Sequence, residues 1–108
     1  MLDVKYIKEN IETVKAAVKS RNMDLDREID EVARLDDERR ALIFDSEQKK
    51  ARQNAVSKQI PQMKKEGKDP APIFAEMKEL SNEIKAHDAR QSEIEARIRE
   101  LLYEIPNL

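Results

Sequence analysis

The sequence predicts an all-α fold: a long antiparallel two-helix coiled-coil hairpin with short N-terminal helices packed at its base. Charged residues make up 41% of the 108 residues, and aromatic residues make up 4%. This balance suits helices that bury a narrow seam and is too polar for a compact globule. Seam residues also recur at alternating steps of three and four in two long runs, as in a coiled coil. The single glycine, Gly67, lies between the two runs.

The two runs are in register with each other. In an antiparallel pair the residue numbers of facing positions add to a nearly constant value, and they do so here, as for Val32 with Ile105. The middle of the seam is polar, and Lys49 faces His87 there. We expect these polar layers to fix the register rather than to form a metal or catalytic site. The predicted seam positions are Val32, Leu35, Arg39, Leu42, Ser46, Lys49, Gln53, Val56, Ile60 and Met63, followed by Met77, Leu80, Ile84, His87, Gln91, Ile94, Ile98, Leu101 and Ile105.

Residues 1–25 are predicted to form one or two short helices that cap the base of the hairpin. Asn10 is a suitable N-cap for a helix that ends near residue 21. Ile11, Val14 and Val18 lie on one face of that helix. Because this stripe is too short to be stable alone, we expect it to pack on the open end of the hairpin.

The first long helix is predicted over residues 26–66, with Asp24 or Asp26 as its cap. Pro61 lies inside this range and lacks the N–H that a helix interior needs. Since the seam spacing continues beyond the proline, we expect a kink at residues 57–61 rather than a break.

The tip turn is predicted at residues 67–70, and the second long helix over residues 71–105. Gly67 supplies the left-handed residue that commonly follows a helix. Asp69 can cap the second helix, and a proline follows it at the first helical position, where a missing N–H costs little. Pro106 ends that helix.

The residue types exclude several classes of function. The chain has no Cys and a single His, and it contains no Gly-rich phosphate loop and no cluster with metal-ligand spacing. A two-helix hairpin also offers no pocket that could enclose a substrate. We therefore expect no catalytic residue, no metal site and no enzymatic activity from this chain alone. No signal peptide or membrane span is found, so we expect a cytoplasmic protein with no membrane partner.

The charges are unevenly distributed along the chain. Residues 48–75 carry seven basic and two acidic groups, whereas the segments on either side are net acidic. A solvated coiled-coil face is the ordinary interpretation of such a run. Here, however, the run lacks interleaved acids until Glu66, and its ammonium and amide donors could follow a phosphate backbone. The candidate RNA-binding residues share one face of the predicted first helix and are Lys50, Asn54, Ser57, Lys58, Lys64, Lys65 and Lys68.

The chain resembles the N-terminal arm of bacterial seryl-tRNA synthetase over essentially its whole length. The segments that carry this resemblance are Met-Leu-Asp-Val-Lys-Tyr-Ile-Lys-Glu-Asn at 1–10, Ile-Asp at 29–30, Leu-Asp-Asp-Glu-Arg-Arg at 35–40, Asn54 with Ser57, Lys58 and Ile60, Lys-Lys-Glu-Gly at 64–67, and Ile-Pro-Asn-Leu at 105–108. Two positions depart from the family pattern. Gln53 stands where an Arg is usual, and Pro61 stands where a small residue is usual.

The resemblance implies a function in translation. In that family the arm precedes a class II catalytic domain and reaches across a homodimer to the long variable arm and elbow of serine tRNA. The resemblance thus implies serine tRNA and the catalytic domain of the same protein as partners, with ATP and Mg bound in that domain and no cofactor in the arm. The arm alone is expected to be a monomer or a weak dimer. The alternative is a protein-interaction or structural coiled-coil hairpin without an RNA ligand.

Overall fold

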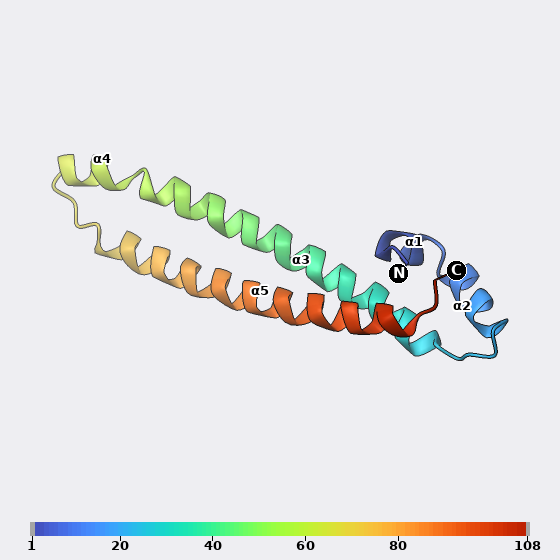
Figure 1. Cartoon of the computed structure of the whole chain (residues 1–108). Helices are drawn as coiled ribbons and strands as arrows, with labels where there is room; N and C mark the ends of the chain where they lie inside the picture. The colour runs from blue at the N-terminus through green and yellow to red at the C-terminus, as the bar shows by residue number, and fades with distance from the viewer. Residues whose placement is uncertain (1, 108) are drawn as a thin grey trace. The chain divides into compact units, whose positions relative to one another are not determined.

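The computed structural model describes residues 2–107, and within them it is all-α with no strand. Met1 and Leu108, which belong to segments carrying the resemblance, lie outside the described residues. Figure 1 shows two long helices, α3 and α5, side by side and antiparallel, so the predicted helical hairpin is confirmed. The helices are α1 (Val4–Glu9), α2 (Ile11–Lys19), α3 (Asp26–Ser57), α4 (Ile60–Lys65) and α5 (Ala71–Glu104).

The chain divides into two compact units. The terminal unit combines the residues up to Arg40 with those from Ser92 onward, and the central unit is Ala41–Gln91. The terminal unit therefore holds α1, α2, the first part of α3 and the last part of α5. The central unit holds the rest of α3 and α5 together with α4 and the turn between them.

The core of the terminal unit is apolar and is shared by four helices. Val14 and Val18 of α2 are fully buried, as the predicted packing of the short helices on the hairpin requires. Two ion pairs also connect α2 to α3, since Lys15 lies 2.8 Å from Asp30 and Lys19 lies 3.0 Å from Asp26. The remaining buried apolar residues of this unit are Ile7, Ile29, Val32, Leu35, Ile94, Ile98, Leu101, Leu102 and Ile105.

A buried carboxylate holds α1 against α3 in the same unit. The Asp36 side chain is 2% exposed and accepts hydrogen bonds from Lys8 Nζ at 3.0 Å, Arg39 Nη2 at 2.9 Å and Arg40 Nε at 2.9 Å. Burial raises the pKa of Asp36, but the bonds from Arg40, Lys8 and Arg39 outweigh it and lower the pKa to about 2. Asp36 is therefore charged at neutral pH and stabilises this unit.

The ends of the short helices differ in detail from the sequence prediction. Asn10 is the N-cap residue of α2 as predicted, but its side-chain amide donates to the Tyr6 carbonyl at 3.0 Å and makes no capping bond to α2. After α2, Asn22 adopts a left-handed φ of 62°, and the bonds from the Asn22 and Met23 amides to the Lys19 and Val18 carbonyls form a Schellman motif. The sequence did not predict this turn.

The first long helix is interrupted at residues 58–59, just before Pro61, so the predicted kink within a single helix over 26–66 is wrong. The α3 helix ends at Ser57, and α4 begins at Ile60 with Pro61 in its first turn. Pro61 has no N–H to donate to the Ser57 carbonyl, and its ring disfavours helical backbone in the residue before it. A proline is tolerated in the first turn of a helix, so starting a new helix satisfies the backbone better than a strained continuation.

The turn between α4 and α5 follows the predicted signals. Gly67 has φ 72°, and the bonds from the Gly67 and Lys68 amides to the Lys64 and Met63 carbonyls complete a Schellman motif. The Asp69 carboxylate then accepts from the Ala71 amide at 3.0 Å and caps α5. At the start of α3, Asp24 rather than Asp26 is the cap, because its carboxylate accepts from the Asp26 amide at 3.4 Å.

The predicted seam is confirmed by burial. Every seam position given by the sequence analysis is buried or half-buried on both long helices. The prediction omitted Ile73, which is buried in the first turns of α5.

Candidate RNA interface

The polar layer in the middle of the central unit is an acid–base cluster. The Asp45 carboxylate lies 2.7 Å from Lys49 Nζ and 2.6 Å from His87 Nε2, so it bridges the two seam residues predicted to face each other. Lys49 also lies 3.4 Å from Glu83 across the seam. The bond from Lys49, followed by that from His87, lowers the pKa of Asp45, and Asp45 in turn raises the pKa of Lys49. The Lys49 ammonium is therefore neutralised by carboxylates within the hairpin.

Arg52 extends this pattern along the same side of the seam. Its Nε donates to a carboxylate oxygen of Glu76 at 2.8 Å, which forms a second charged link between α3 and α5. We call the side that carries Asp45, Lys49 and Arg52 of α3 with Glu76, Glu83 and His87 of α5 the paired flank.

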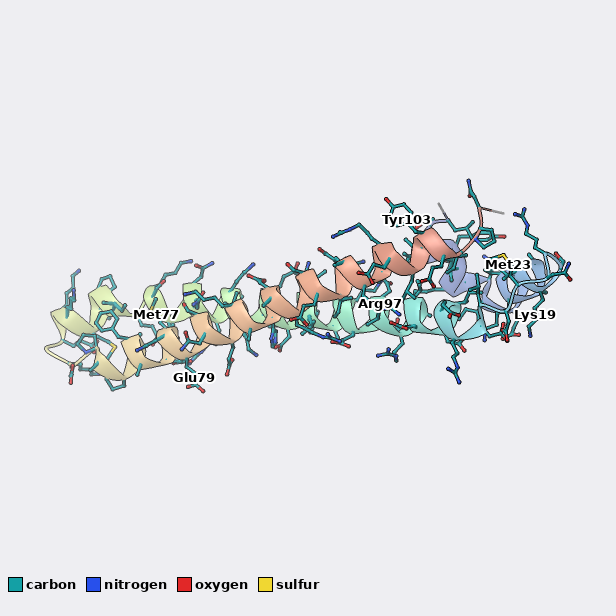
Figure 2. The ribbon with its side chains drawn as sticks, turned by 60° about the horizontal axis from the view of Figure 1, so that its bottom comes forward. Lys19, Met23, Met77, Glu79, Arg97 and Tyr103 are labelled. Carbon is teal, nitrogen blue, oxygen red and sulfur yellow. The ribbon has the colours of Figure 1, made fainter. Side chains whose placement is uncertain are left out.

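Gln53 marks the opposite side of the seam. Its amide donates to Ser81 Oγ at 2.7 Å and to the Met77 carbonyl at 3.4 Å. At about 100° per residue, Ser81 lies about 140° from Glu76 around α5. Figure 2 shows Met77 between the two helices, whereas Glu79 projects from the outer side of α5. The hairpin thus has a second flank, on the Ser81 side.

Three of the predicted RNA-binding residues lie on α3 along this second flank. Lys50, Asn54 and Ser57 fall within an arc of about 60°, on the side of Gln53 away from Arg52. Lys50 and Asn54 are exposed, and among residues 2–107 the Lys50 ammonium has no ion-pair partner. Ser57 is half-buried, and its hydroxyl donates to the Asn54 carbonyl at 3.0 Å, which leaves its oxygen able to accept.

The other four predicted residues do not share one helix, because the helix on which they were projected is broken. Of these four only Lys58 extends the α3 face, since its amide still donates to the Asn54 carbonyl at 3.3 Å. Lys58 lies in the break, Lys64 and Lys65 form the last turn of α4, and Lys68 lies in the turn before α5. All four are exposed. Lys68 is paired with Glu66 at 3.0 Å, whereas the ammonium groups of the other three have no ion-pair partner within the described chain.

The structure adds two lysines of α5 that the sequence analysis missed. Lys78 and Lys85 are exposed, lie within about 60° of Ser81 around the helix, and have no ion-pair partner in residues 2–107. Glu76, Glu79 and Glu83 are about 100° or more away from both lysines, whereas Asp88, one turn after Lys85, lies about 60° from it and forms no ion pair with it in residues 2–107. These lysines were overlooked because residues 76–108 are acidic overall. Projecting α5 around its axis from the predicted seam positions would have placed the lysines on a different side from the glutamates.

The two helices together form what we call the unpaired flank: Lys50, Asn54, Ser57 and Lys58 with Lys78 and Lys85. Between residues 50 and 58 and between residues 74 and 85, no acidic side chain lies on this flank. Glu47, one turn before Lys50, and Asp88, one turn after Lys85, bound this stretch, and the lysines inside it produce a positive field that favours a polyanion. In the part of the chain that the structure describes, no group of three His, Asp or Glu side chains could hold a metal ion.

Fold and surface together define a helical-hairpin module with lysines that have no ion-pair partner among residues 2–107 on one flank. Comparison with known proteins assigns the chain to a family. The model of the seryl-tRNA synthetase N-terminal domain matches residues 1–108, so the chain belongs to the seryl-tRNA synthetase N-terminal domain family.

Relatives are bacterial proteins named serine–tRNA ligase. The chain is 42% identical over 108 residues to the ligase of Staphylococcus haemolyticus and 43% identical over 108 residues to that of Carboxydothermus hydrogenoformans. It is 45% identical over 109 residues to the ligase of Clostridium tetani. Each match covers 100% of this chain but only 25% or 26% of the relative, so the chain spans about a quarter of the length of these proteins. No helix within residues 2–107 is both long and apolar enough to cross a bilayer.

Proposed function

We propose that this chain is the tRNA-binding arm of a serine–tRNA ligase, and that its unpaired flank contacts the phosphates of serine tRNA. The observation that carries the proposal is the asymmetry of the central unit. Acids and bases neutralise each other on the paired flank, while the lysines of the unpaired flank have no ion-pair partner among the described residues. Rows of unneutralised ammonium groups bind a phosphate backbone by releasing its counterions.

The ligand fits the family to which the chain belongs. The unpaired flank offers few groups that could read base edges, so recognition would follow the shape of a folded RNA. The long variable arm and elbow of serine tRNA provide such a shape. Lys64 and Lys65 of α4 would add phosphate contacts at the tip, and Lys68 would do so once released from Glu66.

The rest of the ligation chemistry would belong to the remainder of the protein. ATP and Mg would bind in the catalytic domain, as the resemblance to the family implies. The arm would then act by holding the tRNA in place, without a catalytic residue of its own. The parent enzyme would be a cytoplasmic homodimer, and the isolated arm a monomer or a weak dimer.

Charge reversal on the two flanks tests the proposal. The Lys58→Glu/Lys78→Glu variant should bind serine tRNA at least tenfold more weakly than the parent chain in a fluorescence anisotropy titration. With four to six phosphate contacts, the parent should show a slope of about −3 to −5 in log K against log salt, and the variant a slope reduced by about 2.

The matched control exchanges charges on the paired flank. Arg52→Glu/Glu76→Arg keeps the net charge and preserves an ion pair between the helices, so its affinity for the tRNA and its salt slope should equal those of the parent. Equal tRNA affinity of the lysine variant and the parent would exclude the unpaired flank as the binding surface. A tRNA without a long variable arm should bind more weakly than serine tRNA.

A further inference from the structure

One large apolar side chain lies exposed beside the unpaired flank. Phe74, in the first turns of α5, is 49% exposed, although its neighbour Ile73 is buried in the seam. The chain has only two Phe and two Tyr residues. Exposing an aromatic ring to water forgoes the stabilisation that burial would give, so this ring is available for a ligand.

The ring lies in line with the lysines of α5. At about 100° per residue, Phe74 is about 40° from Lys78 and about 20° from Lys85 around the helix axis. Phe74 and Lys78 are also one turn apart, a spacing at which side chains are neighbours on a helix surface. Glu76, the nearest acid in sequence, lies about 160° away and is held by Arg52 on the paired flank.

The backbone that carries Phe74 is rigid. Prolines at 70 and 72 fix two φ angles in this turn, and the Asp69 carboxylate caps it. The amides of Ile73 and Phe74 both donate to the Pro70 carbonyl, at 3.0 and 3.1 Å. A platform that is already ordered loses little conformational entropy on binding.

We propose that Phe74 is a stacking platform for an unpaired nucleobase of the RNA whose phosphates contact the unpaired flank. This inference rests on the proposed function and adds a base contact to it. Proteins that bind unpaired nucleotides combine a positive groove that follows the backbone with an aromatic side chain that stacks on a base. The row from Phe74 to Lys78 and Lys85 provides both elements on one helix. An apolar surface on a protein partner would not use these cations.

Tryptophan fluorescence provides a direct test, because the chain has no Trp. In the 108-residue chain, Phe74→Trp should keep the tRNA affinity within about threefold, and its emission should be quenched when serine tRNA binds. Phe74→Ala and Phe74→Leu should each lose about 5- to 100-fold in affinity, because neither side chain can stack on a base. The slope of log K against log salt should stay at the parent value, since no charge changes.

Phe44 supplies the matched control. It is 66% exposed on the outer side of α3, about 120° around the helix from Lys50 and about 21 Å along the helix from Lys58. Phe44→Trp should not be quenched by the tRNA, and Phe44→Ala should bind as the parent does. Circular dichroism of each variant confirms that the helices are retained.

The outcomes separate the inference from the proposed function. Parent-like affinity of Phe74→Ala would overturn the stacking role while leaving the lysine contacts in place. Parent-like affinity of Phe74→Leu would also overturn it, because Leu keeps the apolar contact and lacks the ring. Absence of salt-dependent tRNA binding by the parent chain would overturn the proposed function and the inference together.

Discussion

Replacing Asp36 by Asn should destabilise the terminal unit at neutral pH. The Asp36 carboxylate is buried and accepts hydrogen bonds from Lys8, Arg39 and Arg40, so it joins α1 to α3. The amide of Asn keeps one acceptor oxygen but carries no charge, and it cannot satisfy three cationic donors. The side chains of Lys8, Arg39 and Arg40 are partly exposed, so water can hydrate them in the variant. The variant therefore loses the stabilisation of the carboxylate but does not bury unpaired cations.

The magnitude follows from the pKa. Burial raises the pKa of Asp36, but the hydrogen bonds from Arg40, Lys8 and Arg39 outweigh it and lower the pKa from its ordinary value of 3.8 to about 2. That difference corresponds to about 2.5 kcal/mol of folding free energy at neutral pH. Because the folded-state pKa is the lower one, this stabilisation is complete above about pH 4 and is lost as the pH falls through about 2.

Thermal unfolding followed by circular dichroism at 222 nm measures the effect. At pH 7 the Asp36→Asn variant should unfold roughly 10–20 °C below the parent, since 1 kcal/mol shifts Tm by about 4–8 °C in a chain of this size. The difference in Tm between the two proteins should decrease as the pH falls from 4 to 2. The difference in Tm between variant and parent at each pH cancels the contributions of Glu31, Asp45 and Glu66, whose pKa values are also lowered.

Asp37→Asn is the control for this experiment. Asp37 bonds to the same Lys8 but is 71% exposed, so its replacement should change stability by no more than about 0.5 kcal/mol. A Tm for Asp36→Asn within about 3 °C of the parent at pH 7 would refute the reasoning. A gap that stays constant down to pH 2 would also refute it.

Substitutions at Gly67, Pro61 and Ser46 test the turn, the break and the seam by circular dichroism, through Tm or through the signal at 222 nm. Gly67→Ala should lower the stability by about 1–2 kcal/mol, because φ is 72°. This loss is backbone strain alone, since no atom lies within 4 Å of the added Cβ, and Gly67→Asn should lower the stability less. Pro61→Ala should increase the signal at 222 nm by joining α3 to α4, whereas Pro72→Ala, in the first turn of α5, should not. Ser46→Ala should leave Tm unchanged or raise it, because the buried Ser46 hydroxyl has no hydrogen-bond partner among residues 2–107; a clear drop in Tm would contradict this.

Much of the fold could be predicted because its signals are local or periodic. The seam repeats every three or four residues, and each position predicted from that spacing is buried or half-buried. The caps at Asp24 and Asp69 and the left-handed Gly67 depend only on neighbouring residues. The break at Pro61 could not be settled in this way. A kink and a break keep similar seam spacing, and the choice between them depends on whether the backbone groups around Ser57 find partners.

The candidate interface was harder to predict because it depends on two helices at once. Lys50 and its neighbours are visible as a basic run, but Lys78 and Lys85 are interleaved with acids along the sequence. Only the angular positions around α5 separate these lysines from Glu76 and Glu83. The acids are then found opposite Arg52 and Lys49, and the lysines on the other flank. The difference in charge between the two flanks therefore arises from the pairing of α3 with α5 and cannot be read from the sequence of either helix alone.

Gln53 shows how a departure from the family pattern relates to this asymmetry. The family usually has an Arg at this position, beside the Asn of the unpaired flank. Here the Gln53 side chain lies in the seam and bonds to Ser81 and to the Met77 carbonyl, so it contributes to holding α3 against α5. The change therefore removes one cation next to the unpaired flank and adds a contact between the helices. Lys78 and Lys85 of α5, together with Lys50 and Lys58, leave enough positive charge on that flank for the proposed phosphate contacts without an Arg at position 53.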